Sequence, residues 1–171
     1  MIAELPERTR RVIELGGGTG VFTRALLAWG IEPGQLLVVE LNTTLAALLE
    51  RDFPGVEIAQ GNAAELEALV ASSRFGLDGP ADAVFSGLGL LAMSQSVQRE
   101  ILAASFGCLG PEGCFIQFTY GHTNPVSPQV LTELGLHVRR GATTWRNLPP
   151  ATVFVYTRSR SVHVVPRSMA G

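Results

Sequence analysis

Short apolar runs alternate with amphipathic segments along this chain, and the alternation predicts an α/β fold. The apolar runs are nearly continuous, which is typical of parallel strands with both faces buried. The amphipathic segments repeat their apolar residues at helical spacing. The predicted strands are residues 11–13, 35–39, 56–59, 83–86, 114–119, 137–140 and 152–156. The predicted helices are residues 22–29, 43–52, 63–71, 94–106 and 128–134.

Together these elements predict a seven-stranded, mostly parallel sheet with helices on both faces. The last two strands, joined by residues 145–150, are expected to form a C-terminal antiparallel hairpin. Local chemistry predicts some helix boundaries. Asn42 or Thr43 caps the second helix, while Ser94 caps the fourth helix and Gly107 ends it.

Length and composition favour one domain. The chain has 171 residues, 46% of them hydrophobic, which is enough to bury a full core. We expect a single domain over residues 1–171, with a core at 11–158 and a tail at 159–171. The net charge of -2 gives no general attraction to nucleic acid. Because neither a signal peptide nor a membrane-spanning apolar run is evident, a cytoplasmic location is expected.

The two cysteines, Cys108 and Cys114, flank a predicted turn at residues 110–113. Two cysteines are too few for a disulfide framework, and we interpret both as buried thiols. The three histidines show no ligand spacing relative to the cysteines, so no metal site is predicted.

Residues 14–20, Glu-Leu-Gly-Gly-Gly-Thr-Gly, carry the strongest chemical signal. They follow the first predicted strand and precede the first helix, where glycines let a ligand approach the backbone. A dinucleotide fingerprint needs its third glycine three residues after Gly18, and Val21 occupies that place. The glycines instead alternate, at Gly16, Gly18 and Gly20. This spacing argues against NAD.

Two carboxylates frame the glycine turn. Glu14 lies at the end of the first strand, where its charge repels a phosphate and favours an α-amino group, reached directly or through water. Glu40 closes the second strand about twenty residues after the turn, where a carboxylate can accept both ribose hydroxyl hydrogen bonds. Glu40 suits NAD and S-adenosylmethionine equally. The glycine spacing and Glu14 together indicate S-adenosylmethionine.

The triplet Gly61-Asn62-Ala63 follows the third predicted strand. With the element order, it resembles the class I S-adenosylmethionine-dependent methyltransferases, which have a Rossmann-like fold, over nearly the whole chain. In that family an aspartate holds the adenine amino group from this triplet. Asn62 departs from the pattern, although its side-chain oxygen can accept the same hydrogen bond. The resemblance implies S-adenosylmethionine as cofactor, S-adenosylhomocysteine as product, and these cofactor-binding residues: Glu14, Gly16, Gly17, Gly18, Thr19, Gly20, Glu40, Leu41, Gly61, Asn62, Ala63 and Ser86.

Three further segments narrow the resemblance: Ser-Gly-Leu-Gly-Leu-Leu at 86–91, Gln-Phe-Thr-Tyr-Gly at 117–121 and Trp-Arg-Asn-Leu-Pro-Pro-Ala at 145–151. Over residues 12–158 the chain resembles bacterial phospholipid N-methyltransferases, a group similar to rRNA adenine dimethylases. That group typically has proline where Gly89 stands. The resemblance implies methylation of the phosphatidylethanolamine headgroup toward phosphatidylcholine. It also implies a phospholipid partner at an anionic membrane surface, with no nucleic-acid partner.

Methyl transfer to an amine mainly requires the protein to position the amine and the methyl donor, because the sulfonium methyl is already activated. Ser86 and Tyr120 lie at carboxyl ends of predicted strands and are the candidate catalytic residues, with Tyr120 orienting the amine. The alternative for Tyr120 is a core tyrosine with a satisfied hydroxyl. Arg146 or His122 is expected at the lipid phosphate. The predicted substrate-contacting residues are Leu88, Gly89, Tyr120, His122 and Arg146.

Two other functions stay open. The first is methylation of another acceptor, such as ornithine lipid, a soluble amine or an adenine in RNA. RNA is disfavoured because the counterpart of the dimethylases' Asn-Leu-Pro-Tyr type segment lacks both the asparagine and the base-stacking aromatic residue. The second is a cofactor-binding module that no longer transfers methyl groups, suggested by Asn62, Gly89 and the lack of a helix that could cover the cofactor before the first strand.

The segment before the first strand bears on membrane contact. Proteins of this resemblance usually have an amphipathic N-terminal helix that meets the membrane and covers the cofactor. Only about ten residues precede the first predicted strand, too few for a stable isolated helix. The expectations are a shortened chain, a lid from a neighbouring chain, or a substrate outside a bilayer. Peripheral association with the inner face of the membrane is expected alongside the cytoplasmic location.

Overall fold

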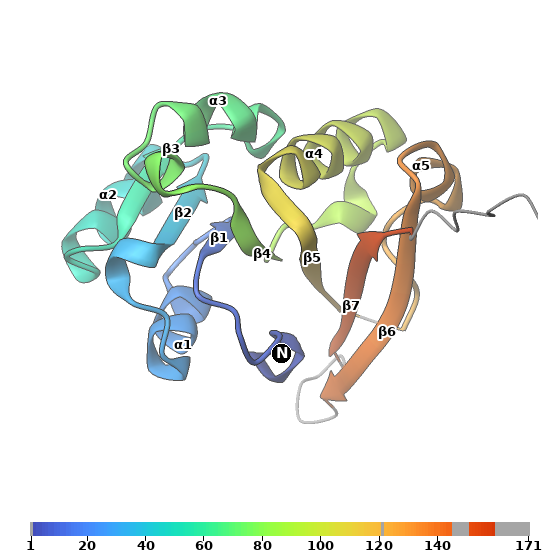
Figure 1. The fold of residues 1–171 in the computed structure, drawn as a ribbon, viewed down its shortest axis with the longest axis horizontal. Coiled ribbons are helices and arrows are strands. Elements are labelled where there is room, and N and C mark those ends of the chain that lie inside the picture. The colour runs from blue at the N-terminus through green and yellow to red at the C-terminus, as the bar shows by residue number, and fades with distance from the viewer. Residues whose placement is uncertain (1, 121, 145–150, 160–171) are drawn as a thin grey trace, which may run out of the picture.

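A seven-stranded sheet forms the centre of the protein (Figure 1). The computed structural model describes residues 2–120, 122–144 and 151–159. Its strands, in the sheet order β3-β2-β1-β4-β5-β7-β6, are β1 (Val12–Leu15), β2 (Leu36–Glu40), β3 (Glu57–Gln60), β4 (Ala81–Ser86), β5 (Leu109–Tyr120), β6 (Leu136–Thr144) and β7 (Ala151–Arg158). Its α-helices are α1 (Val21–Trp29), α2 (Thr43–Asp52), α3 (Leu66–Ala71), α4 (Gln95–Cys108) and α5 (Pro128–Glu133). The predicted α/β class and the seven strands are confirmed.

The strand directions place the expected ligand crevice beyond the carboxyl ends of the central strands. Strands β1 to β5 run parallel to one another. Strand β7 is antiparallel to both β5 and β6, which confirms the predicted C-terminal hairpin. The chain leaves central β1 toward β2 on one side and later returns to β4 on the other side. Ligands of such sheets bind beyond the carboxyl ends of the strands where the order reverses, here above β1 and β4.

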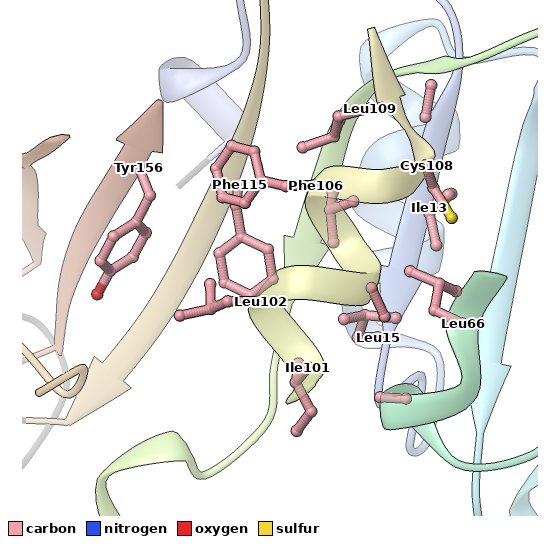
Figure 2. Packing of buried hydrophobic residues seen from close by; sticks show 14 of the residues in the cluster. Ile13, Leu15, Leu66, Ile101, Leu102, Phe106, Cys108, Leu109, Phe115 and Tyr156 are labelled. Carbon is pink, nitrogen blue, oxygen red and sulfur yellow. The ribbon is translucent and has the colours of Figure 1, made fainter. Parts of the chain in front are cut away.

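One face of the sheet is covered by α3, α4 and α5, which lie along the upper side in Figure 1. Leu102 and Phe106 of α4 pack in the same cluster as Leu15 and Phe115 of the sheet (Figure 2). The rings of Phe115 and Tyr156 meet nearly edge to face, with 5.8 Å between centroids. A fully buried side chain of this kind contributes about 1.5–3 kcal/mol. This face therefore holds β4 and β5, and the loops that follow them, on a rigid support.

The opposite face is covered by α1, α2 and the N-terminal segment. That segment contains a 3-10 turn, η1 (Ile2–Glu4), and places Leu5 in the core against this face. The Glu4 carboxylate accepts hydrogen bonds from Arg139 Nη1 at 2.7 Å and from the Ala142 backbone N–H at 2.8 Å. These contacts fasten the start of the chain to β6.

Helix α4 is longer than the sequence predicts. Ser94 caps it as expected, but the helix passes through Gly107 and ends at Cys108. Gly107 lies in the last turn between Phe106 and Cys108, both buried in the core, and a Cβ there would first meet the outer end of the Glu67 side chain of α3. The predicted helix 63–71 also differs, because it begins as a 3-10 turn, η3 (Ala63–Glu65), before α3.

Strand β5 begins earlier than predicted. Leu109 already pairs with Ala81, and pairing resumes between Cys114 and Ala83, so residues 110–113 bulge out of the ladder instead of forming a separate turn. Both cysteines are buried, as predicted. Burial raises the pKa of each thiol to about 11, which keeps them protonated and unreactive at neutral pH.

Membrane-spanning helices and clusters of metal ligands are both absent from the described ranges. No helix among them is long and apolar enough to cross a membrane. Nor do three histidine, cysteine, aspartate or glutamate side chains gather there in a way that could hold a metal ion.

Candidate functional site

The glycine turn between β1 and α1 forms one wall of the crevice. Gly16, Gly18 and Gly20 have φ values of 76°, 55° and 77°, a region where any residue with a Cβ is strained. A Cβ at Gly16 would also lie 2.8 Å from Leu88 Cδ2, and one at Gly20 would overlap the Phe53 ring. The alternating glycines therefore set the shape of the turn. Gly20 also allows the turn to pack closely against the Phe53 ring.

Glu14 lies fully buried beneath this turn. Its Oε2 accepts a hydrogen bond from the Thr23 hydroxyl at 2.7 Å, while its Oε1 has no hydrogen-bond partner in the described part of the chain. Burial raises the pKa of Glu14 to about 7; the hydrogen bonds from Thr23 oppose the shift and the charge of Glu40 adds to it. A buried carboxylate oxygen without a donor is costly. An ammonium group would satisfy it, so the residues present fit the amino-acid end of S-adenosylmethionine.

Glu40 ends β2 and connects it to two neighbouring segments. Its Oε2 accepts the Gly18 N–H at 2.9 Å, and its Oε1 accepts the Asn42 N–H at 2.8 Å. Each carboxylate oxygen retains a second lone pair, so Glu40 can hold the glycine turn and still accept ribose hydroxyls. Of the two candidates for capping α2, Asn42 is the cap, because its side chain accepts the N–H groups of Thr44 and Leu45.

A cavity of about 250 Å³ lies next to Glu40. The Asn62 Oδ1 at its edge accepts the Ala64 N–H at 3.0 Å, so Asn62 also caps η3. Its oxygen keeps one lone pair, and its Nδ2 keeps two hydrogens, for a ligand. Five apolar lining residues were not assigned to the cofactor from sequence: Val39, Leu88, Met93, Val97 and Ile101. The spacing of the last three by four residues could have revealed those three. The cavity is lined by Gly16, Val39, Glu40, Leu41, Gly61, Asn62, Ala63, Leu88, Met93, Val97 and Ile101.

The loop after β4 is held by side chains on both sides of Leu88. Ser86 is fully buried, and its Oγ accepts the Leu88 N–H at 3.3 Å. Gln117 of β5 donates from Nε2 to the Leu88 carbonyl at 2.8 Å. Gly87 donates its N–H to the Leu15 carbonyl at 3.0 Å, while its own carbonyl accepts no hydrogen bond from the described residues. The Gly87 carbonyl is therefore available to a substrate amine.

Gly89 is the position where the resembling group has proline. Its φ is -76°, close to the value that proline imposes, and a Cβ there would meet nothing within 4 Å. The backbone of this loop therefore already has a proline-compatible conformation. Glycine in place of proline raises the conformational entropy of the unfolded chain more than it alters the folded loop.

A second, apolar cavity of about 770 Å³ opens at the ends of β4 and β5. Tyr120 lies at its rim with 60% of its surface exposed, so it is not a core tyrosine. Leu88 lines both this cavity and the smaller one beside Glu40, so the two meet at its side chain. No charged residue stands among the described residues of the larger cavity, which are Val21, Phe22, Gly87, Leu88, Gly89, Leu91, Ala92, Phe118, Thr119, Tyr120, Ala151 and Val153.

His122, also predicted to contact the substrate, is not among the described residues that line the apolar cavity. His122 places its Nδ1 3.1 Å from Arg140 Nη2. Arg140 lies opposite Phe154 in the β6–β7 register, and Phe154 belongs to the face covered by α3, α4 and α5. Val153, which lines the cavity, belongs to the other face. Arg146 lies outside the described residues.

Comparison with known proteins adds one curated relative. No protein-family model matches the chain. Over 117 residues it is 30% identical to the ornithine lipid N-methyltransferase of Singulisphaera acidiphila. The match covers 66% of this chain and 59% of that protein, so it spans less than two thirds of the relative.

Several solved structures share the fold at low sequence identity. A TehB-like S-adenosylmethionine-dependent methyltransferase from Corynebacterium glutamicum aligns with a TM-score of 0.64 at 17% identity, over 92% of this chain and 85% of that one. The glycopeptide N-methyltransferase MtfA, complexed with S-adenosylmethionine, gives 0.65 at 16% identity over 91% and 90%. An amino pentose methyltransferase from Micromonospora echinaspora gives 0.65 at 14% identity over 92% and 87%. The chain therefore has the Rossmann-like class I methyltransferase fold, as predicted.

Proposed function

We propose that this chain is an S-adenosylmethionine-dependent N-methyltransferase that acts on the primary amine of a membrane lipid, with ornithine lipid as the preferred acceptor. One observation carries the proposal: a small cavity edged by Glu40 and Asn62 meets a larger apolar cavity at Leu88. The first suits a nucleoside, and the second suits an amine attached to an apolar body. A site of this layout brings a methyl donor and a lipid amine to one point.

On the cofactor side, each part of S-adenosylmethionine has a residue suited to it. The unpartnered Oε1 of Glu14 suits the ammonium group. The spare lone pairs of Glu40 suit the ribose hydroxyls, and Asn62 suits the adenine edge. When bound, the cofactor supplies an electrophilic methyl group on its sulfonium.

On the acceptor side, the protein has to hold an amine in its neutral form. A free alkylamine has a pKa near 10.4 and is mostly protonated at neutral pH. Burial in an apolar cavity disfavours the charged form and lowers that pKa. The free carbonyl of Gly87 can accept one amine hydrogen and so direct the nitrogen lone pair toward the crevice. We assign the orientation of the headgroup to the hydroxyl of Tyr120, which lies at the cavity rim.

Ornithine lipid is favoured over phosphatidylethanolamine because the curated relative acts on ornithine lipid. Both lipids carry a primary amine, an anionic group and long acyl chains, so the apolar cavity alone does not separate them. The sequence resemblance pointed to phosphatidylethanolamine first and gave ornithine lipid as an alternative. The relative reverses that order.

The proposal is tested by offering the protein labelled S-adenosylmethionine with vesicles that contain ornithine lipid, phosphatidylethanolamine or neither. We expect label in the lipid fraction, faster with ornithine lipid. The variant Glu40→Gln should lose most of this activity, whereas Glu50→Gln, an exposed change on α2, should keep it. Faster labelling of phosphatidylethanolamine would overturn the acceptor preference. Cofactor binding without any lipid product would overturn the proposed activity, and an arm with adenine-containing RNA tests the remaining alternative.

A further inference from the structure

We propose that Phe22, Phe118 and Tyr120 form an aromatic wall that binds the charged headgroup of the lipid by cation–π attraction. This inference rests on the proposed function and deepens it, because it assigns the residues that recognise the headgroup. All three side chains line the apolar cavity.

The three rings form a continuous row. Phe118 and Tyr120 are alternate residues of β5 and their rings meet at 5.0 Å and 82°. Phe22, in the first turn of α1, meets Phe118 at 5.7 Å and 61°. Phe22 also meets Phe85, a fully buried core residue, at 5.3 Å and 65°. The row therefore extends from the rigid core outward to Tyr120 at the rim.

The inner end of the row lies at the point where transfer would occur. A Cβ on Gly87 would lie 3.3 Å from Phe22 Cε2 and 3.4 Å from the Gly16 carbonyl oxygen. The glycine turn, the loop after β4 and the Phe22 ring thus converge. An amine that donates a hydrogen bond to the Gly87 carbonyl would have the aromatic row beside it.

The wall has ring surface to offer a cation. Three other phenylalanine rings are covered by arginine guanidinium groups of the protein: Phe75 by Arg11, Phe53 by Arg24 and Phe106 by Arg158. Within the described ranges no such stacking involves the rings of the wall. The cavity contains no described carboxylate that could hold a cation instead. The π faces are its main source of attraction for positive charge.

This environment favours an ammonium group more strongly as it gains methyl groups. In each transfer the amine lone pair attacks the methyl carbon, the carbon–sulfur bond breaks with its electron pair going to sulfur, and positive charge moves to nitrogen. A proton must leave that nitrogen for bulk water, at the rim where Tyr120 is exposed, before the next transfer. Each methyl group replaces an N–H that would need an acceptor, and the cavity offers few acceptors. Between transfers the rings therefore stabilise the charged headgroup, and its nitrogen reacts only after the proton has left.

Binding of a small headgroup probe tests the wall without turnover. Choline and its neutral carbon isostere, in which a tert-butyl group replaces trimethylammonium, have nearly the same shape. With S-adenosylhomocysteine at saturation, we expect choline to bind about five- to thirtyfold more tightly than the isostere, the range that cation–π attraction gives. Equal affinity for the two probes would overturn the proposal, because a merely apolar cavity cannot prefer the cation.

Four variants separate the rings from other effects. Phe118→Leu and Tyr120→Leu should bring the choline preference down toward one. Tyr120→Phe keeps the ring and should keep the preference. Leu91→Ala shortens an exposed apolar lining residue and should weaken both probes by a similar factor. An unchanged preference in both leucine variants, with S-adenosylhomocysteine binding intact to show that they fold, would contradict the assignment.

The products of turnover give the second readout. The wild-type chain should convert its lipid to dimethyl and trimethyl forms, and Phe118→Leu should slow the second and third transfers more than the first. Equal slowing of all three would mean that the ring has only a structural role. If no aminolipid is methylated while choline is still preferred over its isostere, the proposed function fails but the ammonium site stands.

Discussion

Replacing Glu14 with glutamine should change how cofactor affinity depends on pH. Burial raises the pKa of this carboxyl from 4.5 to about 7, so in the free protein it is half protonated near neutrality. A bound ammonium group would hold it ionised. Below pH 7 cofactor binding must therefore expel a proton from Glu14, and affinity must fall as the solution becomes more acidic.

The size of the effect follows from that pKa. For a free-state pKa of about 7, the protonated fraction weakens binding by a factor of about eleven at pH 6 and about 1.3 at pH 7.5. Affinity should thus rise roughly eightfold between these two pH values. Binding should release about 0.9 proton at pH 6 and about a quarter of a proton at pH 7.5. In Glu14→Gln both dependences should disappear.

Calorimetric titration with S-adenosylhomocysteine measures both quantities, because the binding heat in buffers of different ionisation enthalpy reports the protons released. Glu50→Gln, an exposed carboxyl on α2, is the matched control and should keep the wild-type slope. Affinity that stays constant from pH 6 to 7.5 would refute the reasoning, as would a Glu14→Gln variant with an unchanged slope.

The same substitution should flatten the stability of the free protein between pH 4.5 and 7. A folded-state pKa above the unfolded one gives stability that is complete below about 4.5 and is lost as pH rises toward 7. For a buried carboxyl with a shift of this size, the loss is of the order of 3 kcal/mol. Urea unfolding of the wild-type chain and of Glu14→Gln at several pH values measures it.

Three further predictions concern the loops around the site. Glu40→Gln turns an amide group toward one of the two backbone N–H groups that donate to the carboxylate, so one charge-assisted hydrogen bond is lost. This loss, about 1.5–3 kcal/mol, should weaken S-adenosylhomocysteine binding roughly ten- to a hundredfold in the same titration. An unchanged affinity would contradict the prediction. Gln117→Leu removes the hydrogen bond to the Leu88 carbonyl, so methyl transfer should slow by about tenfold while cofactor affinity changes little. A parallel loss of rate and of cofactor affinity would show that the loop holds the cofactor instead of the acceptor. Gly89→Pro should raise the free energy of unfolding by about 0.4–1 kcal/mol in urea titration, since φ is already -76°, and a destabilised variant would refute the proline-compatible backbone.

The placement of the predicted cofactor residues could be derived from sequence because it depends on local order. Glu14 and Glu40 each close an apolar run, and parallel strands bring their carboxyl ends to one edge of the sheet. The structure places both at that edge and links Glu40 to Gly18 of the glycine turn. Whether the predicted residues contact the cofactor stays a prediction.

Contacts between distant segments could not be derived in this way. Gln117 reaches the Leu88 carbonyl only because β5 pairs with β4, and the register of that pairing cannot be predicted from the local sequence. The aromatic wall likewise depends on α1 lying against the same face as Phe118. Gly107 is a further example, since local sequence predicts a helix end there, whereas the helix continues to Cys108, which is buried in the core.

The most direct test of the central claim is a crystal structure with S-adenosylhomocysteine and a short-chain methylated ornithine lipid. The account predicts that the ribose hydroxyls contact Glu40, the adenine lies beside Asn62, and the lipid nitrogen faces the Gly87 carbonyl and the Phe118 ring. A cofactor bound away from Glu40, or a lipid whose nitrogen lies outside the apolar cavity, would contradict it.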